Sequence, residues 1–383
     1  MRIQPGVTGG YLPRHISSRG RMGAMGPSGG AGAQGKITDV PGVRVGHEQK
    51  SDGGWLSGVT VVLPPAGTVG SVDVRGGGPG THETDALDPT TLVSTVDAVV
   101  LTGGSAYGLV TAHGAQRWCE EQGRGFAVTG GVVPIVPAAA IFDLGRGGDF
   151  SARPDEAMGY AATSAAGTQA EGHDVERGNV GAGTGAVIGR GKYKGGVGTA
   201  SLTLENGVVV GALAVVNALG LPFTPVVEPV ETKPVETEHG DFDKLNQRGS
   251  GDFDKLNQRG SGDFDRLNQR NAPPALNTTL VVVATNAVLD VAECKRTASA
   301  AHAGLARALN PSHTLADGDT VFCLATGGQE LDRSTEAARQ MSLMTLQSAA
   351  ADVVRLAILD GISSAQAVTT PAGEFGAYPG NVR

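Results

Sequence analysis

Apolar and polar positions alternate in short runs along most of this chain, and glycine or proline ends nearly every run. The segments 37–47 (ITDVPGVRVGH) and 58–65 (GVTVVLPP) have the length and β-branched content of short strands. Residues 97–123 predict a strand, a glycine turn and a helix, with Ser105 as the N-cap and Gly123 closing the helix.

The same alternation of strands and helices continues to the C-terminus. The predicted elements are strands broken by prolines in 126–144, a hairpin in 194–220 that turns at Glu205-Asn206-Gly207, a strongly apolar strand in 277–290, a helix in 291–309 that Asp290 caps and Asn310-Pro311 ends, a turn and strand in 315–328, and a helix in 335–360. Strands that alternate with helices indicate packed α/β layers.

Two segments lack this pattern. Residues 1–36 have Arg and Gly but no apolar stretch, which favours a disordered leader over a secretory signal. Residues 222–276 predict a flexible linker, in which the 11-residue unit GDFDKLNQRGS repeats at 240–250 and 251–261 and a shortened copy follows at 262–270. Each unit has too few large apolar residues for a core, so the repeats predict a lengthened linker, with an interaction element as the alternative.

Composition and charge exclude several classes of protein. Glycine makes up 60 of the 383 residues without the period of collagen, and no window of 18 apolar residues predicts a membrane span. The net charge of −8 argues against nucleic acid or an anionic membrane as a partner. Three scattered cysteines make neither a disulfide framework nor a zinc site, and we expect them in the core of a cytoplasmic protein.

Several motifs are weaker than they first look. GAGTGA (181–186) fits the dinucleotide fingerprint, with Glu205 about 20 residues on, but neither a buried strand nor a crossover helix flanks it. GGSAYG (103–108) lacks the glycine that a serine nucleophile elbow needs two residues after Ser105. The histidines stand apart without metal-ligand spacing, and no metal or other cofactor is expected: His47, His82, His113, His302 and His313.

The junction at Asn277–Thr278 is more informative. A proline-containing linker ends at Asn277, and a buried strand starts at Thr278. Downstream, Asp317-Gly318-Asp319 places two carboxylates at the start of another strand, where their i, i+2 spacing aims both at one face. Either motif alone is ordinary strand-entry or turn sequence.

A series of segments stands in a fixed order along the chain: ITDVPGVRVGH, GVTVVLPPAGTVG, RGGGPGTHETD, LTGGSAYGL, VPIVPAAAIFDL, GAGTGA, KGGVGTAS, VVNALG, NTTLVVVATN and DGDTVF. Together they resemble the L-aminopeptidase/D-Ala-esterase/amidase family, with its β-peptidyl aminopeptidases and 6-aminohexanoate-oligomer endohydrolase. The resemblance covers about 37–220 and 277–365. It implies an α/β fold, the four-layer αββα sandwich of N-terminal-nucleophile-like hydrolases, in which 37–221 is the large-chain part and 277–383 the small-chain part.

Members of this family cut themselves into two chains, and the resemblance implies cleavage between Asn277 and Thr278. Thr278 then becomes the N-terminal nucleophile. Asp317 and Asp319 match the pair that contacts the nucleophile; the aminopeptidase branch has Ser and Glu there.

Three further positions match the family pattern. Asn217 matches an asparagine that stabilises the oxyanion or holds the nucleophile. Lys194 matches a frequent lysine, although the glycine spacing leaves Lys192 and Arg190 open. Phe142 stands where members often have an aromatic hydroxyl, which phenylalanine lacks.

The residue types suit the implied chemistry. A threonine hydroxyl is a weak nucleophile and needs a base, and cleavage before Thr278 would free an α-amine with a pKa of about 7.7–8.0. Nearby carboxylates would weaken that amine as a base, so an orienting role suits Asp317 and Asp319 better.

Three functions follow as hypotheses. The first is a self-processing amide or peptide hydrolase that acts on peptides from the N-terminal side or on small amides. The second is an acyltransferase on the same fold, and the third is a non-catalytic binding protein that acts through the linker repeats. The resemblance also implies a homo-oligomer of processed protomers.

Overall fold

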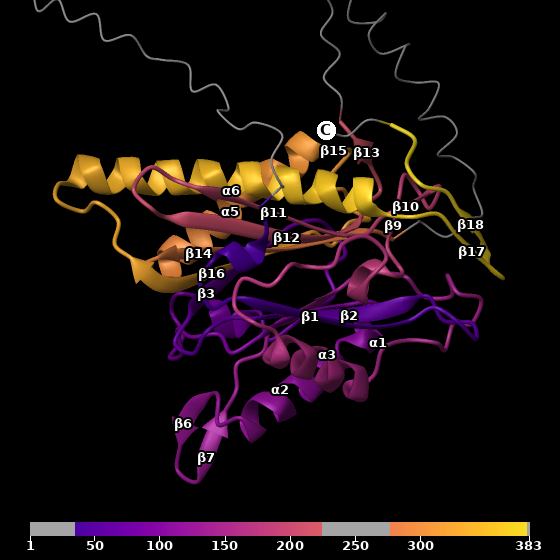
Figure 1. Ribbon diagram of the computed structural model, residues 1–383, viewed down its shortest axis with the longest axis horizontal. Coiled ribbons are helices and arrows are strands. Elements are labelled where there is room, and N and C mark those ends of the chain that lie inside the picture. The colour runs from indigo at the N-terminus through magenta and orange to yellow at the C-terminus, as the bar shows by residue number, and fades with distance from the viewer. Residues whose placement is uncertain (1–34, 224–275, 381–383) are drawn as a thin grey trace, which may run out of the picture. The chain divides into compact units, whose positions relative to one another are not determined.

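Two five-stranded sheets face each other, and helices cover the outer face of each sheet (Figure 1). The computed structural model describes residues 35–223 and 276–380; most of the expected leader and linker, and all of the tandem repeats, lie outside these residues. The four layers confirm the αββα prediction.

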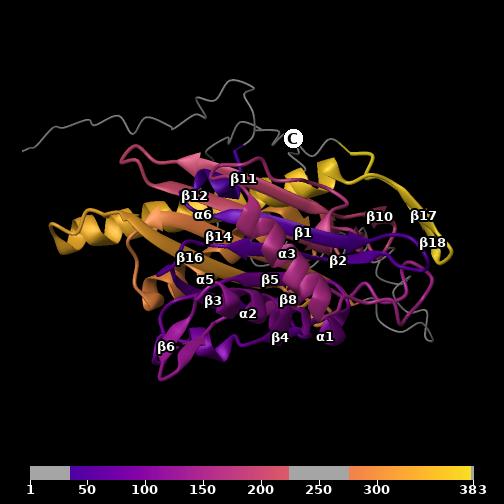
Figure 2. The same cartoon turned by 60° about the horizontal axis from the view of Figure 1, so that its bottom comes forward.

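The first sheet has the strand order β1-β2-β5-β8-β4. Its strands are β1 (Arg44–Lys50), β2 (Ser57–Leu63), β4 (Thr81–His82), β5 (Val99–Thr102) and β8 (Ala138–Ala140). All neighbours are antiparallel except β5 and β8. Its outer face packs against α2 (Thr111–Glu121) and α3 (Glu156–Thr168), which lie toward the viewer in Figure 2.

The second sheet has the order β11-β12-β14-β16-β3. Its strands are β3 (Val69–Val74), β11 (Val197–Thr203), β12 (Val209–Asn217), β14 (Thr278–Ala287) and β16 (Thr320–Gln329). Here β14 and β16 are the parallel pair, and the other neighbours are antiparallel. Its outer face packs against α5 (Val291–Ala308) and α6 (Glu336–Ser364).

The alternation along β14 shows how this strand serves two cores. Leu280 and Val282 point into the layer between the sheets, while Val281 and Val283 belong to the cluster under α5 and α6. All four are fully buried. A strand that is covered on both faces has apolar residues at nearly every position. The apolar run in 277–290 has this pattern.

Short elements connect these layers. They are the 3-10 turns η1 (Ile37–Asp39), η2 (Asp85–Leu87) and η3 (Gly181–Gly183), the helix α1 (Ser105–Gly108), and the strand pairs β6 (Phe126–Val128) with β7 (Gly131–Val133), β9 (Val187–Ile188) with β10 (Tyr193–Lys194), β13 (Leu221–Pro222) with β15 (Leu309–Asn310), and β17 (Val368–Thr370) with β18 (Gly373–Phe375).

Most of the predicted elements are confirmed, but two predictions are wrong. Residues 37–47 do not form one strand: η1 comes first, and the left-handed turn at Gly42, with a φ of 79°, separates it from β1. Ser105 is not an N-cap, because Gly104 occupies that position with a φ of 80°. This left-handed turn lets the Gly104 N–H reach Asp143 Oδ1 at 2.6 Å.

The helix α6 is long and apolar enough to cross a membrane by length and composition alone. It packs along the second sheet, however, and Leu346, Val353, Val354 and Ile358 are fully buried there. Core packing therefore accounts for its apolar composition.

Candidate active site

Thr278 is the first residue of β14, the central strand of the second sheet. Parallel neighbours start at the same edge of a sheet, whereas an antiparallel neighbour ends there. The start of β16 and the end of β12 therefore meet at Thr278. Asn217, the last residue of β12, is the register partner of Thr278, and Asn277 forms a parallel bridge with Asp317 just before β16.

The peptide between Asn277 and Thr278 is buried and held on several sides. The Thr278 hydroxyl donates to the carbonyl oxygen of Asn277 at 2.5 Å, and the Gly318 N–H donates to the same oxygen at 3.1 Å. The Asn277 N–H in turn donates to the carbonyl of Ala316 at 3.1 Å. Asn277 and Thr278 are only 2% and 4% exposed. The threonine hydroxyl thus lies beside the carbonyl group of the preceding residue.

The two aspartates hold different parts of the surrounding backbone. Asp319 accepts from the Thr279 N–H at 2.7 Å, directly after Thr278. Asp317 accepts from the Thr314 N–H and hydroxyl at 2.7 and 2.6 Å. Burial raises the pKa of Asp317, and the neighbouring charge of Asp319 adds to that effect. Both aspartates therefore flank the start of β14 in the fold, and their carboxylates are occupied by backbone and side-chain donors.

His313 is a residue of this site that the sequence did not reveal. Its Nδ1 lies 2.8 Å from Asp319 Oδ2, and its backbone N–H donates to the same oxygen at 3.1 Å. The His313 ring also packs edge-on against His302, with 4.8 Å between centroids. His82 and His113 make a similar contact, with 5.5 Å between ring centroids. The prediction that the histidines stand apart is therefore wrong for these two pairs in the folded chain.

Asn217 is anchored by Arg146, a second residue that the sequence did not reveal. Arg146 Nη1 donates to Asn217 Oδ1 at 2.6 Å, and the Val187 N–H donates to that oxygen at 3.1 Å. The Asn217 amide donates at 3.5 Å to the carbonyl of Phe142, the residue that lacks the aromatic hydroxyl. Among the described hydrogen bonds of the Asn217 side chain, none reaches Thr278.

Lys194 is fully buried, whereas Lys192 and Arg190, the other two candidates, are exposed. Its ammonium donates to the carbonyls of Gly183, Thr184 and Ala186 at 3.2, 2.8 and 2.6 Å. The segment GAGTGA therefore wraps a lysine, which explains its tight backbone without a nucleotide.

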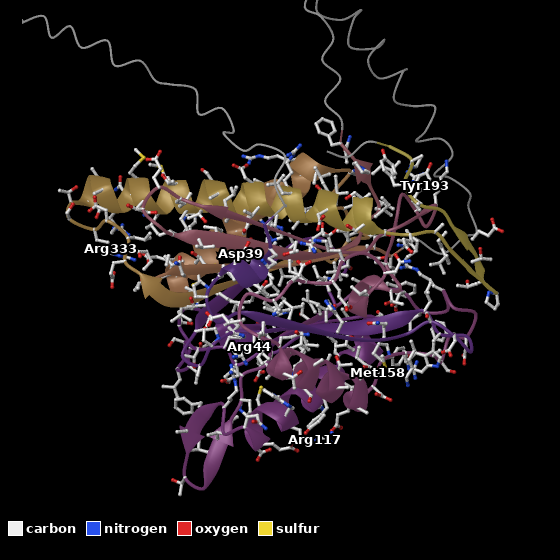
Figure 3. All side chains as sticks on the ribbon, in the orientation of Figure 1. Asp39, Arg44, Arg117, Met158, Tyr193 and Arg333 are labelled. Atoms are coloured by element: carbon white, nitrogen blue, oxygen red, sulfur yellow. The ribbon has the colours of Figure 1, made fainter. Side chains whose placement is uncertain are left out.

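The strand that carries Lys194 is tied to the C-terminal segment. Tyr193, labelled in Figure 3, packs edge-on against Tyr378 with 5.4 Å between ring centroids. The Lys194 N–H also donates to the carbonyl of Gly376 at 2.7 Å.

Asp143 supplies the negative charge that faces Arg146 and Lys194. Its carboxylate accepts from the Ser57 hydroxyl at 2.8 Å and attracts both Arg146 and Lys194. Burial lowers the pKa of Lys194 to about 7, and the charge of Arg146 adds to the shift. Burial likewise lowers the pKa of Arg146 to about 10 and raises that of Asp143. Behind the site lie the buried side chains of Asp143 and Lys194 and the partly buried guanidinium of Arg146.

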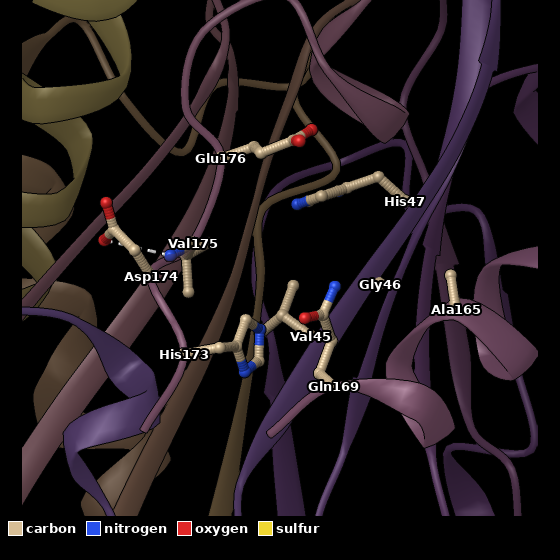
Figure 4. A pocket seen from close by; sticks show the side chains of 9 residues that line it. All are labelled: Val45, Gly46, His47, Ala165, Gln169, His173, Asp174, Val175 and Glu176. Atoms are coloured by element: carbon tan, nitrogen blue, oxygen red, sulfur yellow. Dashed lines mark hydrogen bonds between the residues drawn. The ribbon is translucent and has the colours of Figure 1, made fainter. Parts of the chain in front are cut away.

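A separate cavity of about 380 Å³ opens between β1, the end of α3 and residues 173–176 (Figure 4). Its lining includes His47, His173 and Glu176 and none of the residues around Thr278. Burial and the charge of His173 lower the pKa of His47 to about 4, so this imidazole is neutral at pH 7. Within residues 35–223 and 276–380, no group of three or more His, Cys, Asp or Glu is placed to hold a metal ion.

Comparisons with known proteins identify the family to which this chain is similar. The profile of peptidase family S58 matches residues 35–375. An uncharacterized aminopeptidase of Mycobacterium leprae is 46% identical over 368 residues, which cover 90% of this chain and 94% of the relative. The 6-aminohexanoate-oligomer endohydrolase of Kocuria sp. is 28% identical over 334 residues, which cover 84% of each chain.

A solved structure is similar in fold. The L-aminopeptidase D-Ala-esterase/amidase of Ochrobactrum anthropi, described as a variant of the Ntn hydrolase fold, superposes with a TM-score of 0.62. The alignment covers 91% of this chain and 93% of that one at 22% identity. At this identity the comparison shows similarity of fold only.

Proposed function

The chain belongs to peptidase family S58 and is a hydrolase of peptide or amide bonds, and on that premise we propose that it cuts its own Asn277–Thr278 bond and then uses Thr278 as an N-terminal nucleophile. The observation that carries the proposal is the 2.5 Å contact between the Thr278 hydroxyl and the carbonyl oxygen of Asn277. This contact supports attack by a nucleophile on its own preceding carbonyl.

Self-cleavage proceeds through an ester. Thr278 Oγ1 bonds to the carbonyl carbon of Asn277, its proton passes to the nitrogen of Thr278 directly or through water, and the carbon–nitrogen bond breaks. Water then opens the ester, which leaves a carboxylate on Asn277 and returns the hydroxyl to Thr278. The new α-amine of Thr278 has a reference pKa of about 7.7–8.0, which suits a general base at neutral pH.

Substrate hydrolysis repeats these steps in a second molecule. The Thr278 amine takes the hydroxyl proton, the hydroxyl attacks a peptide or amide carbonyl, and the acyl-enzyme is hydrolysed. In this proposal Asn217 donates to the oxyanion through its side-chain nitrogen. Arg146 and Val187 occupy its oxygen, and the nitrogen makes a long 3.5 Å hydrogen bond to the Phe142 carbonyl. Asp317 and Asp319 hold the backbone around the nucleophile.

The names of the relatives support one substrate class over another. The mycobacterial relative is named an aminopeptidase, and at 46% identity it favours cleavage of N-terminal residues over the oligomer hydrolysis named for the Kocuria relative. Amino-acid anilides and linear 6-aminohexanoate oligomers, assayed side by side, distinguish these two substrate classes.

Intact mass spectrometry of the purified protein tests the self-cleavage. The 383-residue chain should give fragments of 277 and 106 residues, because the cut follows residue 277. Thr278→Ala should remain one chain and lack hydrolase activity. Thr279→Val is the matched control, since it removes the hydroxyl of the adjacent threonine and should still be cut. An uncut wild-type chain would refute the proposal.

Two rival functions make different predictions. If the protein transfers acyl groups, added amines should yield amide products in place of the free acid. If the protein acts only through its repeats, Thr278→Ala should change nothing, and deletion of residues 240–270 should abolish the cellular function.

A further inference from the structure

We propose that Gly318 is a catalytic residue of self-cleavage, because its N–H binds the oxyanion that forms on Asn277 and its missing side chain leaves room for the Thr278 hydroxyl. This inference rests on the proposed function. It adds a backbone donor from the residue between the two aspartates.

The hydrogen bonds of the Asn277 carbonyl point to this role. In the uncut chain the oxygen accepts from both the Thr278 hydroxyl and the Gly318 N–H. The hydroxyl loses its proton when Oγ1 bonds to the carbonyl carbon, so it can no longer donate to that oxygen. The Gly318 N–H remains, at 3.1 Å, while negative charge develops on the oxygen. Donors aimed at developing charge are usually the largest single contribution to catalysis.

The position of this N–H is fixed on both sides. The Asp317 carboxylate is held by the N–H and hydroxyl of Thr314, and its carbonyl accepts from the Gly78 N–H at 2.9 Å. On the other side, the Asp319 carboxylate is held by the Thr279 N–H. Both aspartates therefore orient the peptide that carries the donor, and the donor needs no rearrangement when the charge appears.

Glycine is required at 318 by space and not by backbone conformation. A Cβ added there would lie 2.7 Å from the carbonyl oxygen of Gly78, 2.8 Å from Thr278 Oγ1 and 2.9 Å from Pro79 Cα. Two of these neighbours are backbone atoms of the adjacent loop. An added methyl group would therefore displace the nucleophilic oxygen or push the loop away.

Alanine substitutions distinguish this role from a general need for small residues in the loop around Gly78 and Pro79. Gly318→Ala should slow the conversion of the full-length chain into its two fragments by at least about tenfold, measured by intact mass over time after synthesis in a cell-free system. Gly80→Ala is the matched control from the neighbouring loop that carries Gly78 and Pro79, because its Cβ would meet Ala140 atoms only at 3.7 and 3.8 Å. It should convert at the wild-type rate.

A backbone substitution tests the donor itself. Glycolate at position 318, introduced by suppressor tRNA, replaces the N–H by an ester oxygen and adds no atom. It should slow conversion by about 10²-fold, the usual effect of losing one oxyanion donor. If the melting temperature of Gly318→Ala is well below that of the wild type, the glycolate variant tests the role of the Gly318 N–H in its place.

The outcomes are distinct. Conversion at the wild-type rate by the glycolate variant, or by a folded Gly318→Ala variant, overturns the role of Gly318. A wild-type chain that is never cut instead refutes the proposed function on which this role depends.

Discussion

Arg146 donates a 2.6 Å hydrogen bond to the side-chain oxygen of Asn217, 71 residues further along the chain. The bond decides which end of the amide is available for chemistry. An amide side chain has one acceptor end and one donor end, and here Arg146 and the Val187 N–H occupy the acceptor. The donor end is therefore left on the side of Phe142, whose carbonyl it meets at the long distance of 3.5 Å.

Asn217→Asp is expected to separate folding from catalysis. The carboxylate has nearly the same shape and still accepts from Arg146, so the fold should be kept, but no donor remains for an oxyanion. Turnover of substrate by the processed protein should fall about 10²- to 10³-fold, with a small change in KM. Steady-state kinetics and a thermal melt measure both effects, and Asn217→Ala shows what losing the Arg146 contact adds. Unchanged kcat in Asn217→Asp would exclude Asn217 as an oxyanion donor.

The sequence pattern predicts most strands and helices of this fold because each element carries its own local signal, whereas the four-layer arrangement is implied by the family resemblance. The run from 277 to 290 is apolar on both faces, and β14 is covered on both faces. Asp290 caps α5 through a reciprocal pair of bonds with Glu293, as its spacing indicates. The error at Ser105 arose because the capping geometry depends on Asp143, far along the chain, which binds the Gly104 N–H.

The anchoring residues of the site have no such local signal. His313 reaches Asp319 only because the turn before β16 folds back on itself, with His313 at a φ of 55°. Arg146 reaches Asn217 only because a loop of the first sheet meets the end of β12. An isolated arginine or histidine in a loop carries no local sign of a distant partner, so the sequence indicates neither contact.

His313→Asn is expected to slow self-cleavage. Asparagine tolerates the left-handed backbone conformation at 313 and keeps the backbone N–H that binds Asp319, but its shorter side chain loses the 2.8 Å contact. The loss should slow fragment formation about tenfold, equivalent to roughly 1.4 kcal/mol and near the lower value for a hydrogen bond to a charged group. Time-resolved intact mass measures the rate, and His113→Asn, at an exposed position, serves as the control. Equal rates for wild type and His313→Asn would mean that Asp319 needs no support from this ring.

Lys194 should make stability depend on pH in the alkaline range. Burial lowers its pKa from 10.5 to about 7, so between these values the unfolded chain binds more protons than the folded one. The free energy of unfolding should therefore rise with pH across this window, by up to about 1.4 kcal/mol per pH unit from this group. Below pH 7 the contribution of Lys194 should be flat.

The comparison with Lys194→Met isolates this contribution, since every other titratable group is present in both proteins. Urea unfolding at several pH values should give a difference curve that climbs from pH 7 to about 10. The variant should also be destabilised at every pH, because three buried carbonyls lose their donor. A flat difference curve would show that the ammonium keeps its ordinary affinity for protons in the fold.

His302 should set part of the acid limit of stability. Its ring is 1% exposed, its Nε2 donates to the Asp73 carbonyl at 3.0 Å, and burial lowers its pKa from 6.5 to about 4. Between pH 6.5 and 4 the unfolded chain therefore binds the extra proton, and stability is lost as the pH falls, by up to about 1.4 kcal/mol per pH unit from this group.

His302→Gln keeps a donor near Asp73 but cannot titrate, so its unfolding free energy should fall less steeply over this window. His113→Gln is the exposed counterpart and should follow the wild-type curve in urea unfolding. Parallel curves for His302→Gln and the wild type would assign the acid sensitivity to other groups, with His47 the next to test.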